Sequence, residues 1–402
     1  MSSKNPIAKI MCYRLSKKYG LEKGVLCLKK ILFLIHDLGQ GGAEKVLVNL
    51  VNNMDYSKFD VTVMTLFDCG ENRSFLNSQV KYKSWCSKMI PGNSHLMKLL
   101  SPKQLHKLII KEKYDIEVAY LEGPCARIIS GCENSDVKIV SWIHSTAHSL
   151  SDIASSFRSC DEAKRCYSKF DSIVYVSEDC LKAFQTYCKT EKKNVVLYNT
   201  NNSEHIIESA KTIPDIPIKS ECFNWCGVGK LVPLKGFDRM LGIQKKLIDD
   251  GLNAHLYILG EGTLKTELQE FCRVNNIENT VTFLGYQINP YQYIAKCDLF
   301  VCSSFSEGFS TAATEALILG VPVCTVEVSG MKEMLGKNNE YGIVVENSDE
   351  ALYQGIKKLL DEKDLWKHYK HQAEMRGKDF STEKTVKAVE DMFFQLYGEQ
   401  VK

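Results

Sequence analysis

The chain has 402 residues, of which 44% are hydrophobic and 25% charged, and its formal net charge at pH 7 is +2. This length is typical of two or three domains, and the composition excludes a chain dominated by disorder. No stretch reaches the roughly 18–20 apolar residues that cross a bilayer, and we expect no nucleic-acid partner.

Most of the basic excess lies at the start of the chain. Residues 1–30 hold eight lysines and arginines against Glu22 alone, so 1–29 reads as a basic N-terminal extension. Ile7, Ile10, Met11 and Leu15 could line one side of a helix there. Two interpretations stay open: the extension lies on an anionic membrane surface, or it is a solvated tail.

The sixteen cysteines do not resemble a disulfide framework, because the chain is long and no run of signal-peptide length opens it. They read as small core residues in a reducing compartment. We therefore expect a cytoplasmic protein, peripheral on the inner face of the plasma membrane if the extension binds there.

Short apolar runs then alternate with amphipathic segments along most of the chain. In the first half we expect strands at 31–35, 61–67, 116–121, 138–143, 172–176 and 194–197, and helices at 43–54, 102–113 and 179–188. Strands that are apolar throughout and separated by helices indicate a parallel sheet covered on both faces. This half should form one Rossmann-like domain, 30–205.

The alternation weakens at 206–220, which holds Pro214 and Pro217 and reads as a linker. It then restarts in a second Rossmann-like domain, 221–380, followed by a final helix in 381–402. There we expect strands at 223–228, 255–259, 281–284, 299–302, 321–325 and 342–345, and helices at 236–249, 263–275, 290–296, 310–319, 350–360, 365–378 and 382–397. Two doubly wound halves place ligands at the carboxyl ends of their strands, in a cleft between them.

A glycine-rich turn follows the first strand, from Gly39 to Glu44, and includes Gly41 and Gly42. Glycines let the backbone approach a ligand, and the following helix start offers free N–H groups to a phosphate. The dinucleotide fingerprint fails here, because Glu44 occupies the position of the third glycine. Tight packing of strand against helix is the alternative.

His144 ends the expected strand at 138–143, where a side chain at the cleft would lie. A histidine at such a place is either a ligand contact or a structural residue, and the sequence leaves both open.

A second glycine-rich loop, from Gly227 to Asp238, contains Lys230 and Lys235. Two lysines five residues apart can reach one diphosphate from different sides as point charges. A solvated charged loop is the alternative, but the surrounding glycines favour a binding function.

Glu307 and Glu315 frame the start of a helix that follows the strand at 299–302, with Ser310 and Thr311 at the helix start. The helix start can hold phosphate, and Glu315 is suited to accept hydrogen bonds from ribose hydroxyls. Glu307 can reach a hexose or a developing positive charge. Buried carboxylates without a ligand would be costly, so we expect both at the cleft.

Taken in order, these four motifs resemble those of family-four retaining glycosyltransferases with the GT-B fold, of the bacterial surface-polysaccharide type. The resemblance covers about residues 30–380. It implies an α/β architecture of two Rossmann-like domains, with an acceptor-binding N-terminal half, a nucleotide-sugar-binding C-terminal half and a last helix that crosses back to the N-terminal domain.

The resemblance also implies roles for individual residues. Lys230 and Lys235 would hold the donor diphosphate, helped by a set at two helix starts: Gly41, Gly42, Ser310 and Thr311. Glu315 would bind the ribose, His144 would contact the donor hexose, and Glu307 would lie beside its reacting face. Relatives often have Arg at the position of Lys230, and Lys lacks the bidentate fork.

The predicted function is therefore transfer of a hexose-type sugar from a nucleotide-diphosphate sugar to a hydroxyl of a glycan or lipid-linked acceptor, with retention of configuration. No Asp-x-Asp motif is present, so we expect no metal and no cofactor. Two alternatives remain: a nucleotide-sugar epimerase of the same architecture, and a catalytically degenerate scaffold that binds sugar nucleotides.

Overall fold

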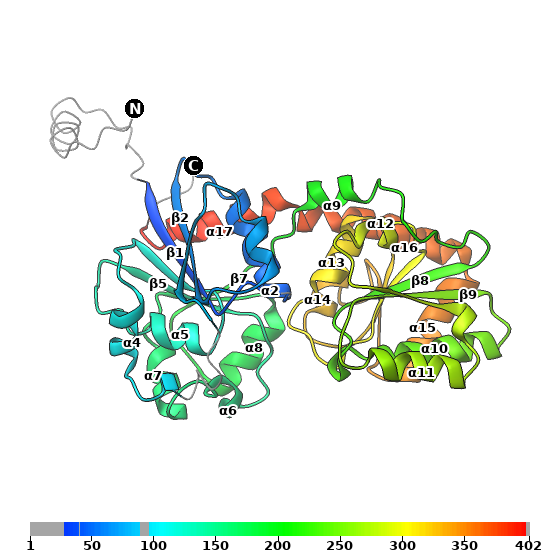
Figure 1. Ribbon diagram of the computed structural model, residues 1–402, viewed down its shortest axis with the longest axis horizontal. Coiled ribbons are helices and arrows are strands. Elements are labelled where there is room, and N and C mark those ends of the chain that lie inside the picture. Colours follow the sequence, from blue (N-terminus) through cyan, green and yellow to red (C-terminus); the bar gives the residue numbers. More distant parts are fainter. Residues whose placement is uncertain (1–27, 40, 89–95, 399–402) are drawn as a thin grey trace.

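The computed structural model describes residues 28–39, 41–88 and 96–398, and the extension 1–27 with its expected membrane-facing helix lies outside the described residues. Two parallel α/β units lie side by side, as Figure 1 shows. Both are sheets with helices on either face, as predicted.

The N-terminal unit is a seven-stranded sheet in the order β3-β2-β1-β4-β5-β6-β7, and every pairing in it is parallel. Its strands are β1 (Lys29–Ile35), β2 (Phe59–Phe67), β3 (Lys81–Cys86), β4 (Ile116–Ala119), β5 (Lys138–Ile143), β6 (Ser172–Tyr175) and β7 (Lys193–Val196). Its helices are α2 (Gly42–Asn53), α4 (Pro102–Ile109), α5 (Pro124–Ile129), α6 (Leu150–Ile153), α7 (Cys160–Tyr167) and α8 (Glu178–Tyr187). The helix that follows β7, α9 (Ser203–Ser209), packs on the C-terminal unit, as Figure 1 shows.

The C-terminal unit is a six-stranded parallel sheet in the order β10-β9-β8-β11-β12-β13. Its strands are β8 (Phe223–Val228), β9 (Ala254–Leu259), β10 (Val281–Gly285), β11 (Leu299–Cys302), β12 (Val323–Val326) and β13 (Ile343–Val345). Its helices are α10 (Phe237–Asp249), α11 (Lys265–Val274), α12 (Tyr291–Ile294), α13 (Thr311–Ile318), α14 (Met331–Leu335), α15 (Asp349–Asp361) and α16 (Lys363–Gly377). In the described part of the chain, 3-10 segments occur at Glu71–Phe75 in the N-terminal unit and at Pro233–Lys235, Glu278–Thr280 and Lys378–Phe380 after it.

The sequence dictates these elements locally. The side chains of β1 from Ile31 to Ile35 are completely buried, because helices cover both faces of the sheet. Helix α4 begins with a capping box, in which Ser101 and Gln104 satisfy each other's backbone N–H groups and Pro102 takes the first turn. Helix α13 begins at Ser310, whose hydroxyl accepts from the Ala313 N–H group.

The last helix, α17 (Thr382–Gln395), leaves the C-terminal unit and packs on the N-terminal one, as Figure 1 shows in red. Phe393 lies edge-on to Phe33 and Phe59, with ring centroids 6.0 and 6.2 Å apart. Glu390 accepts a 2.6 Å hydrogen bond from the Asp55 N–H group. The predicted return of this helix to the N-terminal domain is confirmed.

Several elements have no counterpart in the sequence prediction. The missed elements are β3, α5, α6, α7, α9 and α14, and α4 ends four residues earlier than predicted. Helix α9 occupies the start of the segment predicted as a linker, and 210–222 contains no helix or strand.

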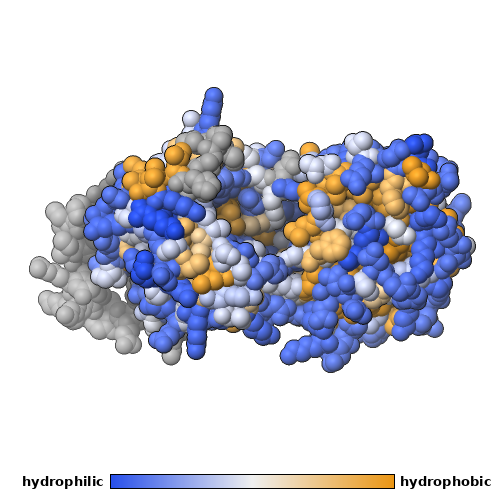
Figure 2. All heavy atoms as spheres, turned by 90° about the horizontal axis from the view of Figure 1, so that it is seen from below, coloured by the Kyte–Doolittle hydropathy of each residue, from blue (hydrophilic) through white to orange (hydrophobic). Residues whose placement is uncertain are grey.

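The described cysteines are all free thiols, and most of them are buried or partly buried in the core. Within 28–39, 41–88 and 96–398, no helix has the length and apolarity to span a bilayer. Figure 2 views the side opposite α17 and shows apolar patches on both units within a mainly hydrophilic surface.

Candidate functional site

The loop from Ser303 to Ser310 joins β11 to α13 and carries Glu307 to the interface between the two units. There Glu307 forms an ion pair with Lys235, with 2.6 Å between Oε1 and Nζ. The Ser304 hydroxyl donates to the same oxygen at 2.6 Å. Glu307 is 11% exposed and Lys235 31%, so this pair is largely shielded yet reachable. Two residues predicted from separate motifs therefore meet at one point.

The backbone at Gly236 positions Lys235. This glycine has φ +65° and ends the 3-10 turn that carries Lys235 just before α10 begins. A Cβ there would lie 2.3 Å from the Ser303 carbonyl oxygen, so only glycine fits. The Ser303 hydroxyl donates to the Lys235 carbonyl at 3.0 Å, which ties the lysine loop to the strand end that precedes Glu307.

The starts of α2 and α13 face each other across the interface. A Cβ at Gly42 would lie 3.6 Å from Thr311 Oγ1, so the predicted Gly41–Gly42 turn and the Ser310–Thr311 turn are neighbours. Both helix starts direct free N–H groups and positive dipole ends to the same region. This pair of helix starts suits an anion with several oxygens.

Glu315 lies inside α13 and is 4% exposed. Its Oε1 accepts from Lys45 Nζ at 2.5 Å and from the Tyr291 hydroxyl at 3.2 Å. Lys45 belongs to α2 of the N-terminal unit, so this ion pair spans the two units. Burial acts to lower the pKa of Lys45, but the charges of Glu315 and Tyr291 outweigh it and hold that pKa well above its usual value.

Lys230 does not join Lys235 at Glu307. It is exposed, and its charge makes a small contribution to the lowered pKa of Asp37 and opposes the rise in the pKa of Glu44, both in the N-terminal unit. The main cause at Asp37 is its 2.7 Å hydrogen bond with His36, whereas burial raises the pKa of Glu44. Lys230 therefore faces the acidic side of the glycine-rich turn.

His144 lies just beyond the end of β5, with its ring stacked on Trp142 and close to Tyr120. Its Nε2 is buried and has no hydrogen-bond partner. Burial lowers the pKa of His144 to about 4, although the charge of Glu122 and a hydrogen bond with the Tyr120 backbone oppose the shift. A neutral ring with an unsatisfied nitrogen is suited to contact a polar ligand.

Side chains of the N-terminal unit donate hydrogen bonds to the backbone of the loop that carries Glu307. The carbonyls of Glu307, Gly308 and Phe309 accept from Thr146 Oγ1 at 3.1 Å, Ser177 Oγ at 3.2 Å and Asn199 Nδ2 at 3.2 Å, respectively. A Cβ at Gly308 would lie 2.0 Å from the His144 carbonyl oxygen, so the units touch backbone to backbone there. His144 and Glu307 thus belong to one site.

Sequence reasoning missed Lys45, Tyr291 and the three side chains that hold the loop. Lys45 directly follows Glu44 in the glycine-rich motif, and this proximity was the one available signal. Thr146 lies two residues after His144. Tyr291, Ser177 and Asn199 lie far from the predicted motifs in sequence and meet the site only through the folding and packing of the two units.

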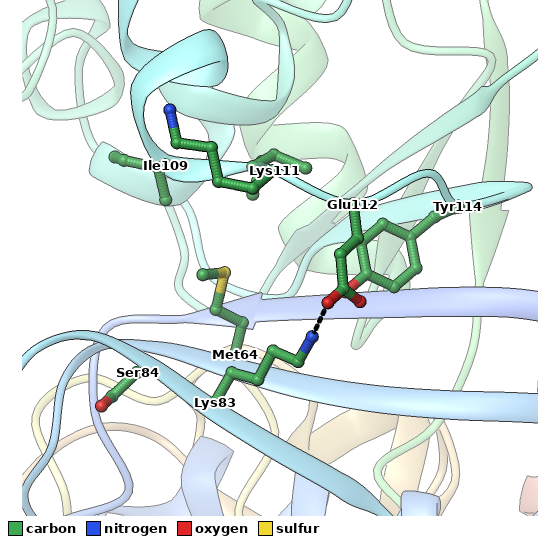
Figure 3. A pocket seen from close by; sticks show the side chains of 8 residues that line it. Met64, Lys83, Ser84, Ile109, Lys111, Glu112 and Tyr114 are labelled. Atoms are coloured by element: carbon green, nitrogen blue, oxygen red, sulfur yellow. Dashed lines mark hydrogen bonds and ion pairs between the residues drawn. The ribbon is translucent and has the colours of Figure 1, made fainter.

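Two pockets lie away from this interface. One, of about 370 Å³, opens beside β2 and β3, where Figure 3 shows Met64, Lys83, Glu112 and Tyr114 around it. Lys83 and Glu112 form an ion pair across its rim. The other lies by α11 and β10. Neither contains a predicted site residue.

One described cluster has the donor atoms for a metal ion: His106, Glu117 and Cys132, with ligand atoms within 4.8 Å of one another. His106 and Glu117 already form a direct 2.7 Å ion pair. The cluster lies near the start of β4, remote from the carboxyl ends of the strands where Glu307 and His144 lie.

Comparison with known proteins points to one family. A model of the group 1 glycosyl transferases matches residues 208–376, and a model of glycosyltransferase family 4 matches residues 40–204. A curated relative from Campylobacter jejuni is 30% identical over 92% of this chain and 100% of its own length. It is named N-acetylgalactosamine-N,N'-diacetylbacillosaminyl-diphospho-undecaprenol 4-alpha-N-acetylgalactosaminyltransferase.

Solved structures share the fold. The Anabaena protein HepE in complex with UDP superposes with a TM-score of 0.72 at 17% identity, covering 91% of this chain and 100% of that one. The lipopolysaccharide outer core galactosyltransferase WaaB superposes with a TM-score of 0.67 at 18% identity, covering 91% and 99%.

The fold and these matches define a glycosyltransferase with the GT-B architecture. The chain belongs to the group 1 glycosyltransferases of family 4, as the resemblance of its motifs implied.

Proposed function

We propose that this glycosyltransferase moves a hexose-type sugar, N-acetylhexosamines included, from a nucleotide-diphosphate sugar to a hydroxyl of a glycan or lipid-linked acceptor, with retention of configuration. The observation that supports it best is the Lys235–Glu307 ion pair, which lies in the loop that precedes α13 and contacts the N-terminal unit through Thr146. The C. jejuni relative supports the acceptor class, since its name describes a sugar on diphospho-undecaprenol. HepE supports the donor class, since its structures hold UDP and glucose.

In this proposal, the bond between the anomeric carbon and the diphosphate oxygen breaks first. Lys235, Lys230 and the helix starts at Gly41, Gly42, Ser310 and Thr311 stabilise the negative charge on the departing diphosphate. Lys235 would exchange its partner Glu307 for phosphate, and Glu307 would then lie beside the positively charged sugar ring.

The acceptor hydroxyl attacks from the face that the diphosphate leaves, and a departing phosphate oxygen takes its proton. No dedicated protein base is needed. His144 contacts the donor hexose through its free Nε2, and Glu315 accepts hydrogen bonds from the ribose hydroxyls. This scheme uses no metal ion or cofactor.

A two-stage experiment tests the proposal. A panel of nucleotide sugars is screened by thermal shift, because a bound donor raises the unfolding temperature by mass action. The stabilising donor is then incubated with and without lipid-linked and free glycan acceptors. A glycosylated product of retained configuration supports the proposal. An isomerised donor without acceptor would establish an epimerase, and binding without turnover on any acceptor would establish a scaffold.

The Lys235→Ala variant tests the assigned chemistry. We expect turnover to fall by about 100- to 1,000-fold, as on removal of one preorganised stabilising group. Lys245→Ala is the matched control, since Lys245 forms only a surface pair with Asp249 on α10. Near-normal turnover of the Lys235 variant would remove that residue from the mechanism.

We also propose a cytoplasmic location, with the basic extension docked on the inner face of the plasma membrane, near a lipid-linked acceptor. The support is its charge, seven basic residues against one acidic in residues 1–29. Deletion of residues 2–28 should lower sedimentation with anionic liposomes but not turnover of a soluble acceptor. Unchanged liposome binding would identify a solvated tail.

A further inference from the structure

Glu315 carries a charge in a place where water hardly reaches it. Its side chain is 4% exposed, and an ionised carboxylate at such a position must be compensated by a partner. The partner is Lys45, at 2.5 Å, and the Tyr291 hydroxyl adds a second hydrogen bond to the same oxygen. Lys45 Nζ also lies 5.3 Å from the centroid of the Tyr291 ring, within cation–π range.

The hydrogen bonds from Lys45 and Tyr291 occupy one oxygen of the Glu315 carboxylate and leave the other oxygen available. Both Lys45 and Tyr291 reach Oε1, and among the described residues no hydrogen bond reaches Oε2. Oε1 therefore fixes the orientation of the carboxylate, and Oε2 stays free to accept from a ligand hydroxyl.

The compensating charge comes from the opposite half of the molecule. Lys45 is on α2, whereas Glu315 and Tyr291 are on α13 and α12. Asn201 of the N-terminal unit donates to Thr314 of α13 at 3.0 Å, so a second hydrogen bond joins the two units close to Glu315. The Lys45 contact that orients Glu315 is made only when the two units are together.

We propose that Lys45 is a positioning residue that orients Glu315, with one oxygen directed to the ribose of the donor nucleotide, so that ribose recognition depends on closure of the two units. This inference rests on the proposed function, in which Glu315 is the ribose ligand. Lys45 acts through Glu315 and does not itself contact the ribose.

The test measures discrimination between ribose and deoxyribose. Whichever of UDP, GDP and ADP binds the wild-type protein most tightly is titrated by calorimetry, alongside its 2′-deoxy form. We expect the wild type to prefer the ribonucleotide. In Lys45→Met, which keeps the length of the side chain and removes the charge, we expect about tenfold weaker ribonucleotide binding and a ribo-to-deoxy affinity ratio near one.

Three further variants test whether the effect of Lys45→Met comes from its lost charge and acts through Glu315. Lys45→Arg should restore most of the discrimination. Lys58→Met is the matched control, because Lys58 forms an exposed pair with Asp55 just beyond α2 and should behave as wild type. In a Glu315→Gln background no buried carboxylate needs compensation, so adding Lys45→Met should leave the affinity ratio unchanged. This double variant also tests the inference if the single variant folds poorly.

Other results overturn the inference. Equal losses of affinity for both nucleotides in Lys45→Met would show that Lys45 attracts the diphosphate. If Lys45→Met keeps the ribo-to-deoxy affinity ratio of the wild type, Glu315 does not depend on Lys45 for ribose recognition. If Glu315→Gln binds with the wild-type ratio, Glu315 is not the ribose ligand and the inference fails while donor binding stands. A wild-type protein that binds none of the nucleotides would overturn the proposed function itself.

Discussion

His144 shows how burial at a domain interface sets the state of a single side chain. Its Nε2 is enclosed without a partner, and desolvation disfavours the charged imidazolium. A residue that the sequence left open between ligand contact and structural role thus has the features of a ligand contact, a neutral ring with one unsatisfied nitrogen.

With a pKa of about 4, His144 should remain neutral throughout the physiological range. We expect its Cε1 proton signal in NMR to stay constant from pH 8 to pH 5. His144→Gln identifies the signal by its loss. Because the folded-state pKa lies below the unfolded value of about 6.5, the neutral ring favours folding above that pH, and this contribution declines as pH falls toward 4. A titration midpoint near 6.5 would contradict the burial argument.

His106 behaves in the opposite way. Burial lowers its pKa, but hydrogen bonds with Cys132 and Glu117 outweigh burial and raise the pKa to about 9. The charged pair therefore stabilises the fold fully below about pH 6.5, and this contribution is lost as pH rises through 9. We expect it to reach about 3 kcal/mol at most.

The measurement is urea unfolding of wild type and His106→Gln at several pH values. The difference in unfolding free energy between the two should shrink between pH 6.5 and 9.5. A constant difference would mean that His106 is uncharged in the folded protein.

At the scale of elements, the site depends on how the β11–α13 loop touches the N-terminal unit. The apolar strand before it and the capping residue after it are local signals, and both were predicted from sequence. The hydrogen bonds from Thr146, Ser177 and Asn199 to its carbonyls come from three separate connections, and no local pattern indicates them.

Gly308→Ala probes this contact. The added Cβ would lie 2.0 Å from a backbone oxygen that cannot rotate away, so the loop and His144 must separate. We expect turnover to drop at least about tenfold, since catalytic geometry tolerates little displacement, while circular dichroism stays unchanged. Gly242→Ala is the control, because nothing lies within 4 Å of a Cβ on that exposed helical glycine. Equal activities in the two variants would show that the close approach is not needed.

The secondary structure could be predicted where burial imposes a pattern. β11 and the Ile31–Ile35 part of β1 are fully apolar because both faces of their sheets are covered. β3 was missed because it is an edge strand of sequence KYKSWC, with no buried residue and no apolar run. α7 was missed because CDEAKRCY is dominated by polar residues and directs only four side chains into the core.

At the scale of the whole molecule, the two-domain plan and the returning helix followed from the sequence, whereas the pairing across the units did not. Lys45 and Glu315 are 270 residues apart, and each looks like an ordinary helical charge in its own segment. Their meeting depends on the relative placement of two domains, which no periodicity encodes.

The returning helix should contribute measurably to the stability of the N-terminal unit. Phe393 is 1% exposed among the aromatic residues of β1 and β2, so Phe393→Ala should lower unfolding stability by about 3–5 kcal/mol. Phe75→Ala removes a phenyl that is 57% exposed and should have little effect. The measurement is the denaturant midpoint of unfolding for each of the two variants. Equal midpoints would show that α17 is a surface attachment.

The packing of α17 on the N-terminal unit also affects when that unit can complete its fold during synthesis. The N-terminal unit is synthesised first, yet the helix that covers Phe33 and Phe59 follows the whole C-terminal unit in the chain and is made only after it. Until residues 382–395 emerge, those aromatic rings remain open to solvent or to chaperones. For the same reason, a chimaera that exchanges the N-terminal unit between two such enzymes should carry α17 with that unit, although the C-terminal unit separates the two in sequence.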